Sequence, residues 1–280
     1  MTRACGVIGK PLRHSISATF QQAAFDAVGL DVRYHAWELE PSQLARHLAW
    51  LRTPDALGCN VTIPYKTSVL DLIDEADVLV RRVGAANTMV NDGGRLLGFN
   101  TDVGGFLRAV RDDGGCDPAG IEALLLGAGG AARAAAVALL DAGVARLQLA
   151  NRHLDRAREL AEHLGDGRVT IVEWHGEAFR SAVAGSALIV NATSAGMLGR
   201  QVDENPLVGF SPPASGLVFD LVANPLRTRL MQESSAAGAR TLGGLPMLVY
   251  QGAESFERWT GLPAPVDVMM RAAEAHMRHG

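Results

Sequence analysis

The sequence lacks the features that place a chain in a membrane or on a nucleic acid. No stretch approaches the roughly 18 apolar residues of a membrane span, and the N-terminal MTRACGVIGKPLRHS has no apolar signal-peptide core. A long basic run is also absent, and the formal net charge is −4. We therefore expect a soluble, cytoplasmic protein that binds neither membranes nor nucleic acids.

Cysteine is scarce as well. The three cysteines, Cys5, Cys59 and Cys116, are isolated and show no CxxC spacing. An odd, scattered set of this kind indicates small buried residues in a reducing compartment and argues against a disulfide framework or a zinc site. We expect no metal ion.

What the sequence does contain is enough apolar material for a core. Of 280 residues, 48% are hydrophobic and 20% are charged, which is typical of a globular chain with two compact units or one large one. Short apolar runs alternate with longer helical patterns, and this order favours an α/β fold with a mainly parallel sheet. The polar stretch DDGGCDPAG (112–120) is the candidate linker.

The periodicity predicts a series of strands and helices on each side of that stretch. Before it we expect strands at Ala4–Ile8, Val32–Glu38 and Leu57–Thr62, helices at Thr19–Val28, Gln43–Arg52, Tyr65–Val83 and Val103–Arg111, and a hairpin in TMVNDGGRLLGF. After it we expect strands at Ala123–Leu126, Leu147–Ala150, Thr170–Trp174, Leu188–Asn191 and Leu217–Leu221, and helices at Ala131–Ala142, Leu154–Leu164, Pro246–Trp259 and Pro265–Met277.

A glycine-rich turn lies between the strand and the alanine-rich helix of LLLGAGGAARAAAVALLDAGV. Gly127 allows the tight turn, Gly129 lets the backbone approach a pyrophosphate, and Ala132 is small enough for helix–strand packing. The helix N-terminus then offers free N–H groups to the phosphates. We predict dinucleotide binding here; the alternative is a crossover that is merely glycine-tight.

The end of the next strand indicates which dinucleotide is bound. An acidic residue there would take the ribose 2′-hydroxyl of NAD, but LANRHLDRA has Asn151, Arg152 and Arg156 instead. Two guanidiniums four residues apart at the start of a helix would share a face and bind a 2′-phosphate. The pattern favours NADP over NAD; the alternative is a solvated basic helix end.

The N-terminal third carries polar residues on otherwise apolar segments. In KPLRHSISATF, the hydroxyls of Ser15 and Ser17 would point to the same side of an extended segment and suit a carboxylate or polyol; the alternative is that they cap the helix that follows. In GCNVTIPYK, Asn60 and Thr62 share a strand face. Pro64 would place Lys66 at a helix start, where the dipole favours the neutral, basic amine; the alternative is an exposed lysine.

A third polar set flanks the predicted hairpin. Asn87 and Thr88 begin it, and Asn100, Thr101 and Asp102 end it. Because the two ends of a hairpin lie side by side, we expect these residues to converge, together with Lys66, on one pocket. The alternative is that Asn100, Thr101 and Asp102 only cap the N-terminus of the helix that follows.

Eight short motifs follow one another along the chain: SxS, GxNVTxPxK, GAxNT, GxNTDxxG, GxGGAxR, NRxxxRA, NATSxGM and MLVxQG. In this order they resemble the shikimate dehydrogenase family over essentially the whole chain. Members of that family are NADP-dependent enzymes of aromatic amino acid biosynthesis that reduce 3-dehydroshikimate to shikimate. The resemblance implies an α/β substrate domain at 1–103, a Rossmann domain at 104–238, and C-terminal helices at 239–280 that return to the first domain. We expect a monomer or a homodimer, and the sequence does not distinguish the two.

The resemblance assigns roles to residues that match the family motifs. The catalytic pair corresponds to Lys66 and Asp102. The substrate shell corresponds to Ser15, Ser17, Asn60, Thr62, Asn87, Asp102 and Gln251. The cofactor shell corresponds to Gly127, Ala128, Gly129, Gly130, Ala131, Ala132, Asn151, Arg152, Arg156, Thr193, Ser194 and Met197.

Departures from the family pattern leave the substrate open. Ala223 in FDLVANP stands where the family commonly has a Tyr that lines the substrate site, and His153 follows Asn151-Arg152 where a threonine is usual. A paralogue that acts on quinate, aminoshikimate or another cyclic hydroxy acid is one alternative. A binding or regulatory protein that holds NADP and a cyclic acid without turnover is another. Methylenetetrahydrofolate dehydrogenases share the two-domain plan but lack the GxNTD hairpin, so they rank lower.

Overall fold

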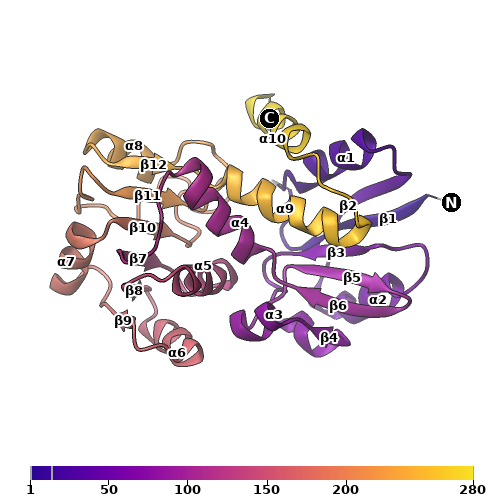
Figure 1. Ribbon diagram of the computed structural model, residues 1–280, viewed down its shortest axis with the longest axis horizontal. Coiled ribbons are helices and arrows are strands. Elements are labelled where there is room, and N and C mark those ends of the chain that lie inside the picture. The colour runs from indigo at the N-terminus through magenta and orange to yellow at the C-terminus, as the bar shows by residue number, and fades with distance from the viewer. Residues whose placement is uncertain (1, 14, 280) are drawn as a thin grey trace. The chain divides into compact units, whose positions relative to one another are not determined.

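The computed structural model describes residues 2–13 and 15–279, and the chain divides into two compact units. The first unit comprises Met1–Gly105 and Val249–Gly280, and the second comprises Phe106–Leu248. Each unit has its own sheet, with six strands in each (Figure 1). The predicted α/β class is confirmed.

The first unit contains a mixed sheet in the order β2-β1-β3-β5-β6-β4. Its strands are β1 (Arg3–Gly9), β2 (Val32–Glu38), β3 (Gly58–Val61), β4 (Glu75–Ala76), β5 (Thr88–Asp92) and β6 (Arg95–Phe99). The β1 strand pairs in parallel with β2 and β3, whereas β5 is antiparallel to β3 and β6. The predicted hairpin, β5–β6, therefore forms the antiparallel part of the sheet.

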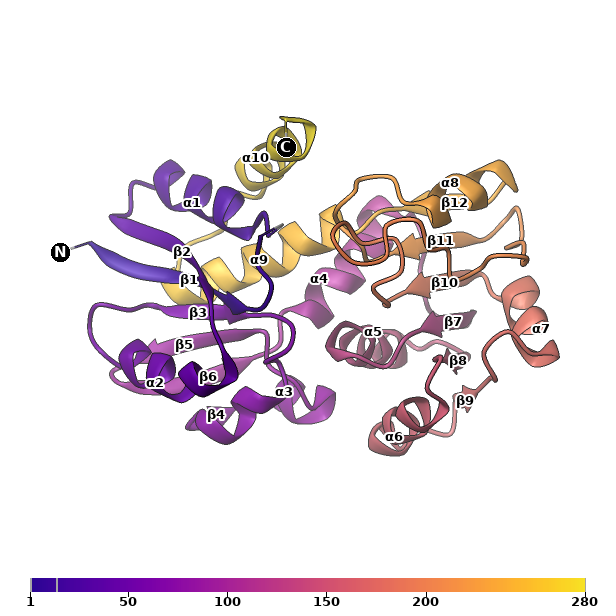
Figure 2. The same cartoon turned by 180° about the vertical axis from the view of Figure 1, so that it is seen from behind.

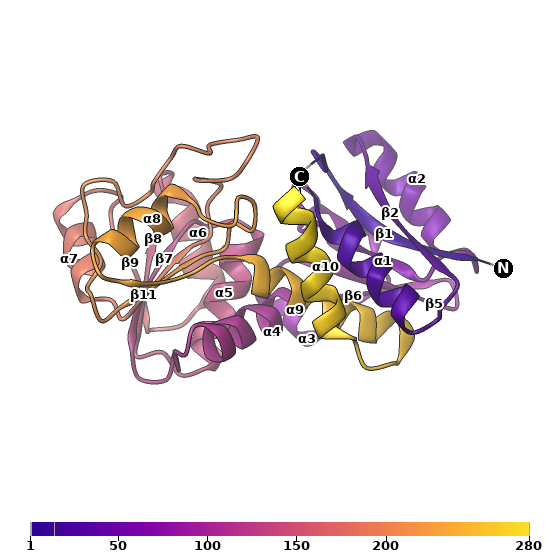
Figure 3. The ribbon, with the colours of Figure 1, turned by 90° about the horizontal axis from the view of Figure 1, so that it is seen from above.

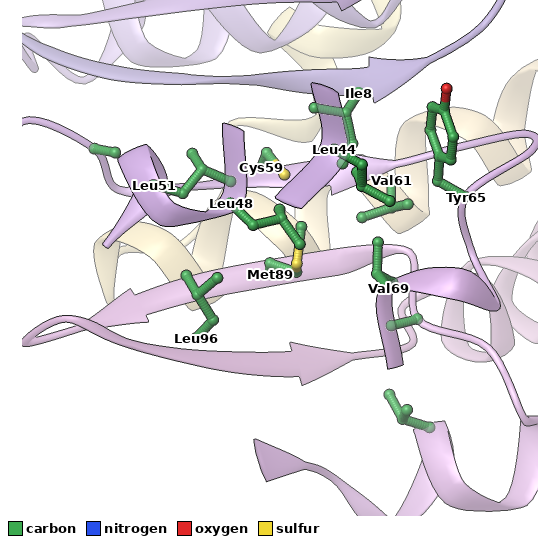
Figure 4. Packing of buried hydrophobic residues seen from close by; sticks show 13 residues of the cluster. Ile8, Leu44, Leu48, Leu51, Cys59, Val61, Tyr65, Val69, Met89 and Leu96 are labelled. Carbon is green, nitrogen blue, oxygen red and sulfur yellow. The ribbon is translucent and has the colours of Figure 1, made fainter. Parts of the chain in front are cut away.

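Helices cover both faces of this sheet, and β3 shows how the sequence separates them. Its odd-numbered residues, Cys59 and Val61, belong to a buried apolar cluster with Leu44, Leu48 and Leu51 of α2 (Pro41–Leu51) (Figure 4). Because side chains of a strand alternate between its two faces, Asn60 points the other way. On that face its amide meets Ser255 of α9 (Leu245–Thr260).

The remaining helices of the first unit complete these layers. They are α1 (Ser17–Ala27), α3 (Val78–Val83), α4 (Asp102–Arg108), of which residues 102–105 belong here, and α10 (Val266–His279). The ring of Phe25 in α1 lies 5.1 Å from that of Phe256 in α9, and α10 runs beside α1 (Figure 3). Both contacts lie on the α9 face of the sheet.

The second unit is built on a fully parallel sheet in the order β12-β11-β10-β7-β8-β9 (Figure 2). Its strands are β7 (Glu122–Leu126), β8 (Arg146–Ala150), β9 (Val169–Ile171), β10 (Leu188–Asn191), β11 (Leu217–Asp220) and β12 (Arg240–Leu242), and its main helices are α5 (Gly130–Asp141), α6 (Leu154–Leu164), α7 (Glu177–Gly185) and α8 (Arg229–Ala236). Counted from β7, the strand order is 3-2-1-4-5-6, which is the Rossmann order.

One predicted helix is wrong. The segment expected to be helical from Tyr65 to Val83 forms a 3-10 helix at Ser68–Leu72, the short strand β4 and then α3. Asp74 and Asp77 explain the interruption, since their carboxylates accept hydrogen bonds from the backbone N–H groups of Leu96 and Val80, both at 2.7 Å. Such side-chain bonds compete with a continuous helix.

The second unit also contains three elements that the sequence pattern did not predict: α7, α8 and β12. Because β12 pairs with β11, residues 239–248 lie in the second unit, although the sequence analysis assigned them to the C-terminal helices. The linker predicted at 112–120 also lies inside this unit, where Arg240 donates a hydrogen bond to the carbonyl of Gly114 at 2.9 Å. The chain leaves the first unit at Gly105 instead.

Candidate functional site

The β5–β6 hairpin brings the polar residues at its two ends together. Asn87 precedes β5, and Asp102 begins α4 after β6. The Nδ2 atom of Asn87 lies 2.8 Å from Thr101 Oγ1 and 2.9 Å from Asp102 Oδ1. The predicted convergence of the hairpin ends is therefore confirmed.

Lys66 joins this cluster through a buried ion pair. Its Nζ lies 2.5 Å from Asp102 Oδ2, and the two side chains are 15% and 7% exposed. A buried carboxylate is costly unless both oxygens have partners, and here Lys66 and Asn87 provide them. An ammonium has three N–H donors, so Lys66 keeps donors for a ligand beyond the one given to Asp102.

The backbone around Lys66 differs from the prediction. The Tyr65 N–H donates to the Thr62 carbonyl at 2.9 Å, and the Ala86 N–H donates to the Lys66 carbonyl at 2.8 Å. Lys66 therefore lies in a turn, and helical structure begins only at Ser68. The predicted helix start at Lys66 is wrong, because no α-helix begins there; the ammonium is instead paired with Asp102.

Asn60 reaches the same cluster from β3, and its amide is bonded within the unit. The side chain is only 6% exposed. Its Oδ1 accepts the Tyr34 hydroxyl at 2.7 Å, and its Nδ2 lies 2.9 Å from Ser255 Oγ. Burial raises the pKa of Tyr34 well above its ordinary value, so the phenol stays protonated and donates.

Gln251 extends the cluster from α9. It is 8% exposed, and its Oε1 lies 3.1 Å from Asn87 Nδ2. Sequence reasoning singled out Gln251 but missed Tyr34 and Ser255. The spacing of Gln251 and Ser255, four residues apart on one helix, could have indicated that both face the sheet.

Three further predicted site residues, Ser15, Ser17 and Thr62, lie in the first unit. Ser17 is the first residue of α1, and Ile16 before it has helical angles, with φ −93° and ψ −1°. The expected extended segment is therefore wrong, because a helical Ile16 does not place Ser15 and Ser17 on one side. Ser15, Ser17 and Thr62 are each half-buried. The N-cap position of α1 is held by Ile16, so neither serine occupies it.

In the second unit, the glycine turn has the shape that a pyrophosphate requires. Gly127 has φ +115°, and a Cβ there would lie 3.0 Å from the carbonyl oxygen of Ala192. Gly129, the N-cap of α5, has no side-chain cap, and a Cβ there would meet no atom within 4 Å. Ala132 is fully buried against the sheet. The first N–H groups of α5 are thus accessible to an anion, which fits a dinucleotide phosphate.

The loop after β10 lies against this turn, as the contact between Gly127 and Ala192 shows. Asn191 Oδ1 accepts the backbone N–H and the hydroxyl of Thr193, at 3.1 and 2.7 Å. Ser194 Oγ donates to Gln201, and the Met197 N–H donates to the Ser194 carbonyl. The glycine turn and the Thr193–Met197 loop, both predicted to hold cofactor, therefore occupy neighbouring strand ends at the point where the strand order reverses.

The predicted arginine pair has a different local geometry from the one expected. Only Arg156 lies in α6, because that helix begins at Leu154 and Arg152 precedes it. The argument from helical spacing is therefore wrong, although both arginines are exposed after β8. Arg152 Nη1 lies 3.7 Å from Glu204 Oε2. Both residues, with Thr193, line a pocket of about 370 Å³.

Asp220 at the end of β11 is the buried charge behind this loop. It is fully buried, and its carboxylate accepts hydrogen bonds from Asn191 Nδ2 at 2.9 Å, Thr228 Oγ1 at 2.6 Å and the Val222 N–H at 3.1 Å. Burial raises the pKa of Asp220 to about 6, and these three hydrogen bonds oppose the rise. Asp220 thus fixes Asn191, which in turn holds Thr193.

Among residues 2–13 and 15–279, no group of three or more His, Cys, Asp or Glu side chains is arranged to hold a metal ion. Within the same residues, none of the helices combines the length and apolarity needed to cross a bilayer. Cys5, Cys59 and Cys116 are free thiols.

These features define a class of protein. A Rossmann unit with an open glycine turn is joined to an α/β unit that presents a lysine–carboxylate pair, which is the architecture of a dinucleotide-dependent dehydrogenase. Family models agree over most of the chain. The Shikimate dehydrogenase substrate binding domain matches residues 7–89, Shikimate / quinate 5-dehydrogenase matches 115–221, and the Shikimate 5′-dehydrogenase C-terminal domain matches 244–274.

Individual proteins are similar over the full length. A shikimate dehydrogenase (NADP⁺) of Symbiobacterium thermophilum is 44% identical, covering 98% of this chain and 94% of the relative. The crystal structure of shikimate 5-dehydrogenase from Thermus thermophilus in complex with NADP(H) and shikimate is 37% identical, with a TM-score of 0.87 and coverage of 98% and 99%. The chain belongs to the shikimate dehydrogenase family.

A more distant solved structure shows that this fold also serves a related substrate. Quinate dehydrogenase from Corynebacterium glutamicum in complex with NAD is 30% identical, with a TM-score of 0.84 and coverage of 98% of this chain and 99% of that one. The fold alone therefore does not distinguish shikimate from quinate.

The raised pKa of Asp220 predicts a pH dependence of stability. The pKa is about 6 in the folded protein against 3.8 as the ordinary value, so between these values the folded state holds a proton that the unfolded state has released. The free energy of unfolding should fall as pH rises from about 4 to about 6, by on the order of 3 kcal/mol. Asp220→Asn cannot ionise, so its stability relative to the wild type should rise across that range in urea unfolding.

Asp166→Asn is the control for this experiment. Arg168 lowers the pKa of Asp166 to about 2, so the stabilisation from that pair is complete above the ordinary carboxyl value and is lost only as pH falls toward the lowered pKa. Its difference from the wild type should be flat between about pH 4 and about pH 7. An equally flat difference for Asp220→Asn would contradict the assignment.

Proposed function

We propose that this protein catalyses the reversible, NADP-dependent reduction of 3-dehydroshikimate to shikimate. The observation that carries the proposal is the Lys66–Asp102 pair, held by Asn87 in a buried cluster of the first unit. The family to which the chain belongs and the named activity of its similar relatives support it. The second unit would bind the cofactor through the turn from Gly127 to Ala132 and through Thr193, Ser194 and Met197.

In this proposal Lys66 handles the proton of the reaction. Bound NADPH supplies a hydride to the ketone carbon of the substrate. Lys66 Nζ donates a proton to the oxygen that becomes the alcohol, and in the reverse direction the neutral amine accepts it. Asp102 orients the ammonium and stabilises its charge through the 2.5 Å contact. One hydride and one proton therefore convert the ketone to a secondary alcohol.

The remaining residues of the first unit would bind and orient the substrate. Ser15 and Ser17 would donate to its carboxylate, and Thr62, Asn87 and Gln251 would bind ring hydroxyls. Asn60 belongs to the same proposed set, and since its amide is bonded to Tyr34 and Ser255, it acts by holding the cluster as much as by touching a ligand. Each of these hydrogen bonds orients the ring so that only one carbon is presented to the cofactor.

Cofactor selection would rest on Arg152 and Arg156, with Asn151 beside them. Both guanidiniums are exposed and lie after β8, where a dinucleotide presents the 2′ position of its ribose. A 2′-phosphate would bond bidentately to a guanidinium, and NAD lacks this group. We therefore propose NADP as the preferred cofactor.

A direct assay tests the proposed substrate. Shikimate, quinate, aminoshikimate and a non-cyclic hydroxy acid would each be offered with NADP⁺ and with NAD⁺, following reduction of the nicotinamide by absorbance. Shikimate with NADP⁺ should give the highest kcat/KM. A preference for quinate would favour the paralogue that Ala223, in place of the family's usual Tyr, leaves open. Binding of shikimate without turnover of any compound would favour the regulatory alternative.

Replacing the proposed proton donor tests the mechanism. The chain has two lysines, Lys10 and Lys66, so a variant of Lys10 serves as the control for a variant of Lys66. Lys66→Ala should lower kcat by about 10²–10⁴, as expected for the loss of acid–base catalysis, while NADP⁺ binding measured by fluorescence is retained. Lys10→Ala, which breaks a surface pair with Glu40, should keep wild-type turnover. Near-normal turnover of Lys66→Ala would contradict the proposed mechanism.

Removing a guanidinium tests the cofactor assignment. Arg152→Ala should raise the KM for NADP⁺ by about 10- to 100-fold, the range expected for hydrogen bonds to a charged group, and leave the KM for NAD⁺ nearly unchanged. Arg158→Ala on α6, whose guanidinium pairs with Asp155, should change neither. An equal rise in the KM for NADP⁺ and for NAD⁺ in Arg152→Ala would show that the guanidinium does not bind the 2′-phosphate.

A further inference from the structure

Ser255 lies at the centre of a buried set of hydroxyls next to the lysine–carboxylate pair. The residue is fully buried on the face of α9 that meets β3 and β5. Its Oγ lies 2.9 Å from Asn60 Nδ2, 2.7 Å from Thr88 Oγ1 and 3.2 Å from Thr101 Oγ1. It also donates to the carbonyl of Gln251, one turn back along the helix, at 2.9 Å.

The directions of these hydrogen bonds follow from the chemistry of the groups. The single proton of Ser255 goes to the Gln251 carbonyl, so its oxygen accepts from its other neighbours. Tyr34 donates to Asn60 Oδ1 at 2.7 Å, and this bond directs Asn60 Nδ2 toward Ser255. The order of donation therefore runs from Tyr34 through Asn60 to Ser255 and then to α9.

The same hydroxyls set the orientation of Asn87. The backbone N–H of Thr101 donates to Asn87 Oδ1 at 2.8 Å, and the Thr101 hydroxyl lies 3.2 Å from that oxygen. With Oδ1 occupied in this way, Nδ2 is directed at Asp102 Oδ1 and Gln251 Oε1. Thr88 and Thr101 both contact Ser255, so Ser255 links α9 to the residues that aim Asn87.

We propose that Ser255, with Tyr34, is a positioning residue for the reaction. Ser255 fixes Asn60, Thr88 and Thr101, and these residues orient the Asn87 amide. The amide in turn holds the Asp102 carboxylate against Lys66. Neither Ser255 nor Tyr34 touches the ion pair itself in the described contacts. The proposal rests on the function proposed above, because its kinetic readout is turnover of the same substrate.

Two single variants and their combination test this role. Ser255→Ala should lower kcat by about tenfold, as expected for losing a buried hydrogen-bonding hub, and leave the KM for NADP⁺ within about twofold. It should also shift the pH profile of kcat, because Asp102 and Lys66 would be held less firmly. Tyr34→Phe should act in the same direction. If both work through Asn60, the double variant should be no worse than the poorer single variant.

Ser186→Ala is the matched control. Ser186, the C-cap residue of α7, is also a buried serine that donates to the carbonyl four residues back, Ala182, at 2.7 Å. Its loss should lower the free energy of unfolding without changing kcat or the pH profile. A folded Ser255→Ala enzyme with wild-type kcat and pH profile would overturn the proposal, as would a loss of activity that only follows the folded fraction. Should Ser255→Ala fail to fold, wild-type kinetics of Tyr34→Phe would overturn it.

A crystal structure of Ser255→Ala separates this proposal from the proposed function. The Asn87 amide or the Asp102 carboxylate should be displaced from the positions described above. Unchanged positions of both groups would overturn the positioning role whatever the activity. Absence of turnover in the wild-type enzyme would instead overturn the proposed function, and the displaced side chains would still support the positioning role.

Discussion

The carboxylate of Asp102 is the group on which the rest of the site depends. The Asp102 side chain is 7% exposed, and a buried charge of this kind persists only where its oxygens have partners. Lys66 provides one and Asn87 the other. Thr88 and Thr101 in turn contact the Asn87 amide and so help to hold it in place. The same contacts that make the carboxylate tolerable therefore also direct the ammonium that is proposed to move the proton.

The fold meets this need by using the two faces of one strand differently. On β3, Cys59 and Val61 complete an apolar core against α2, while Asn60 between them joins a hydroxyl-rich layer under α9. The helix that supplies this layer comes from the far end of the chain, so the C-terminal segment is part of the site and not an appendage. In the second unit, Asp220 has a comparable role, since it holds Asn191 and through it the loop at Thr193.

Whether a feature of this arrangement could be predicted from the sequence depends on how far apart in the chain its interacting residues lie. The turn at Gly127 was predictable because positive φ and close backbone approach are local demands that glycine alone meets. The hairpin that joins Asn87 to Asp102 was also local. Tyr34 and Ser255 were not predictable as a pair, because 221 residues separate them and each has an ordinary explanation by itself. The position of Lys66 differs from the prediction because a proline such as Pro64 suits the first turn of a helix as well as a plain turn, and here the segment turns and becomes helical only at Ser68.

Lys66 and Asp102 are proposed to act as one unit, and a double-mutant cycle on turnover tests this most directly. Single-turnover rates would be measured for Lys66→Ala, Asp102→Ala and the double variant, with shikimate and NADP⁺ at saturation. Residues that act together show strongly non-additive losses, so the double variant should be about as slow as the slower single variant. A double variant whose loss equals the product of the two single losses would mean that the two residues act independently, and would contradict the proposed mechanism.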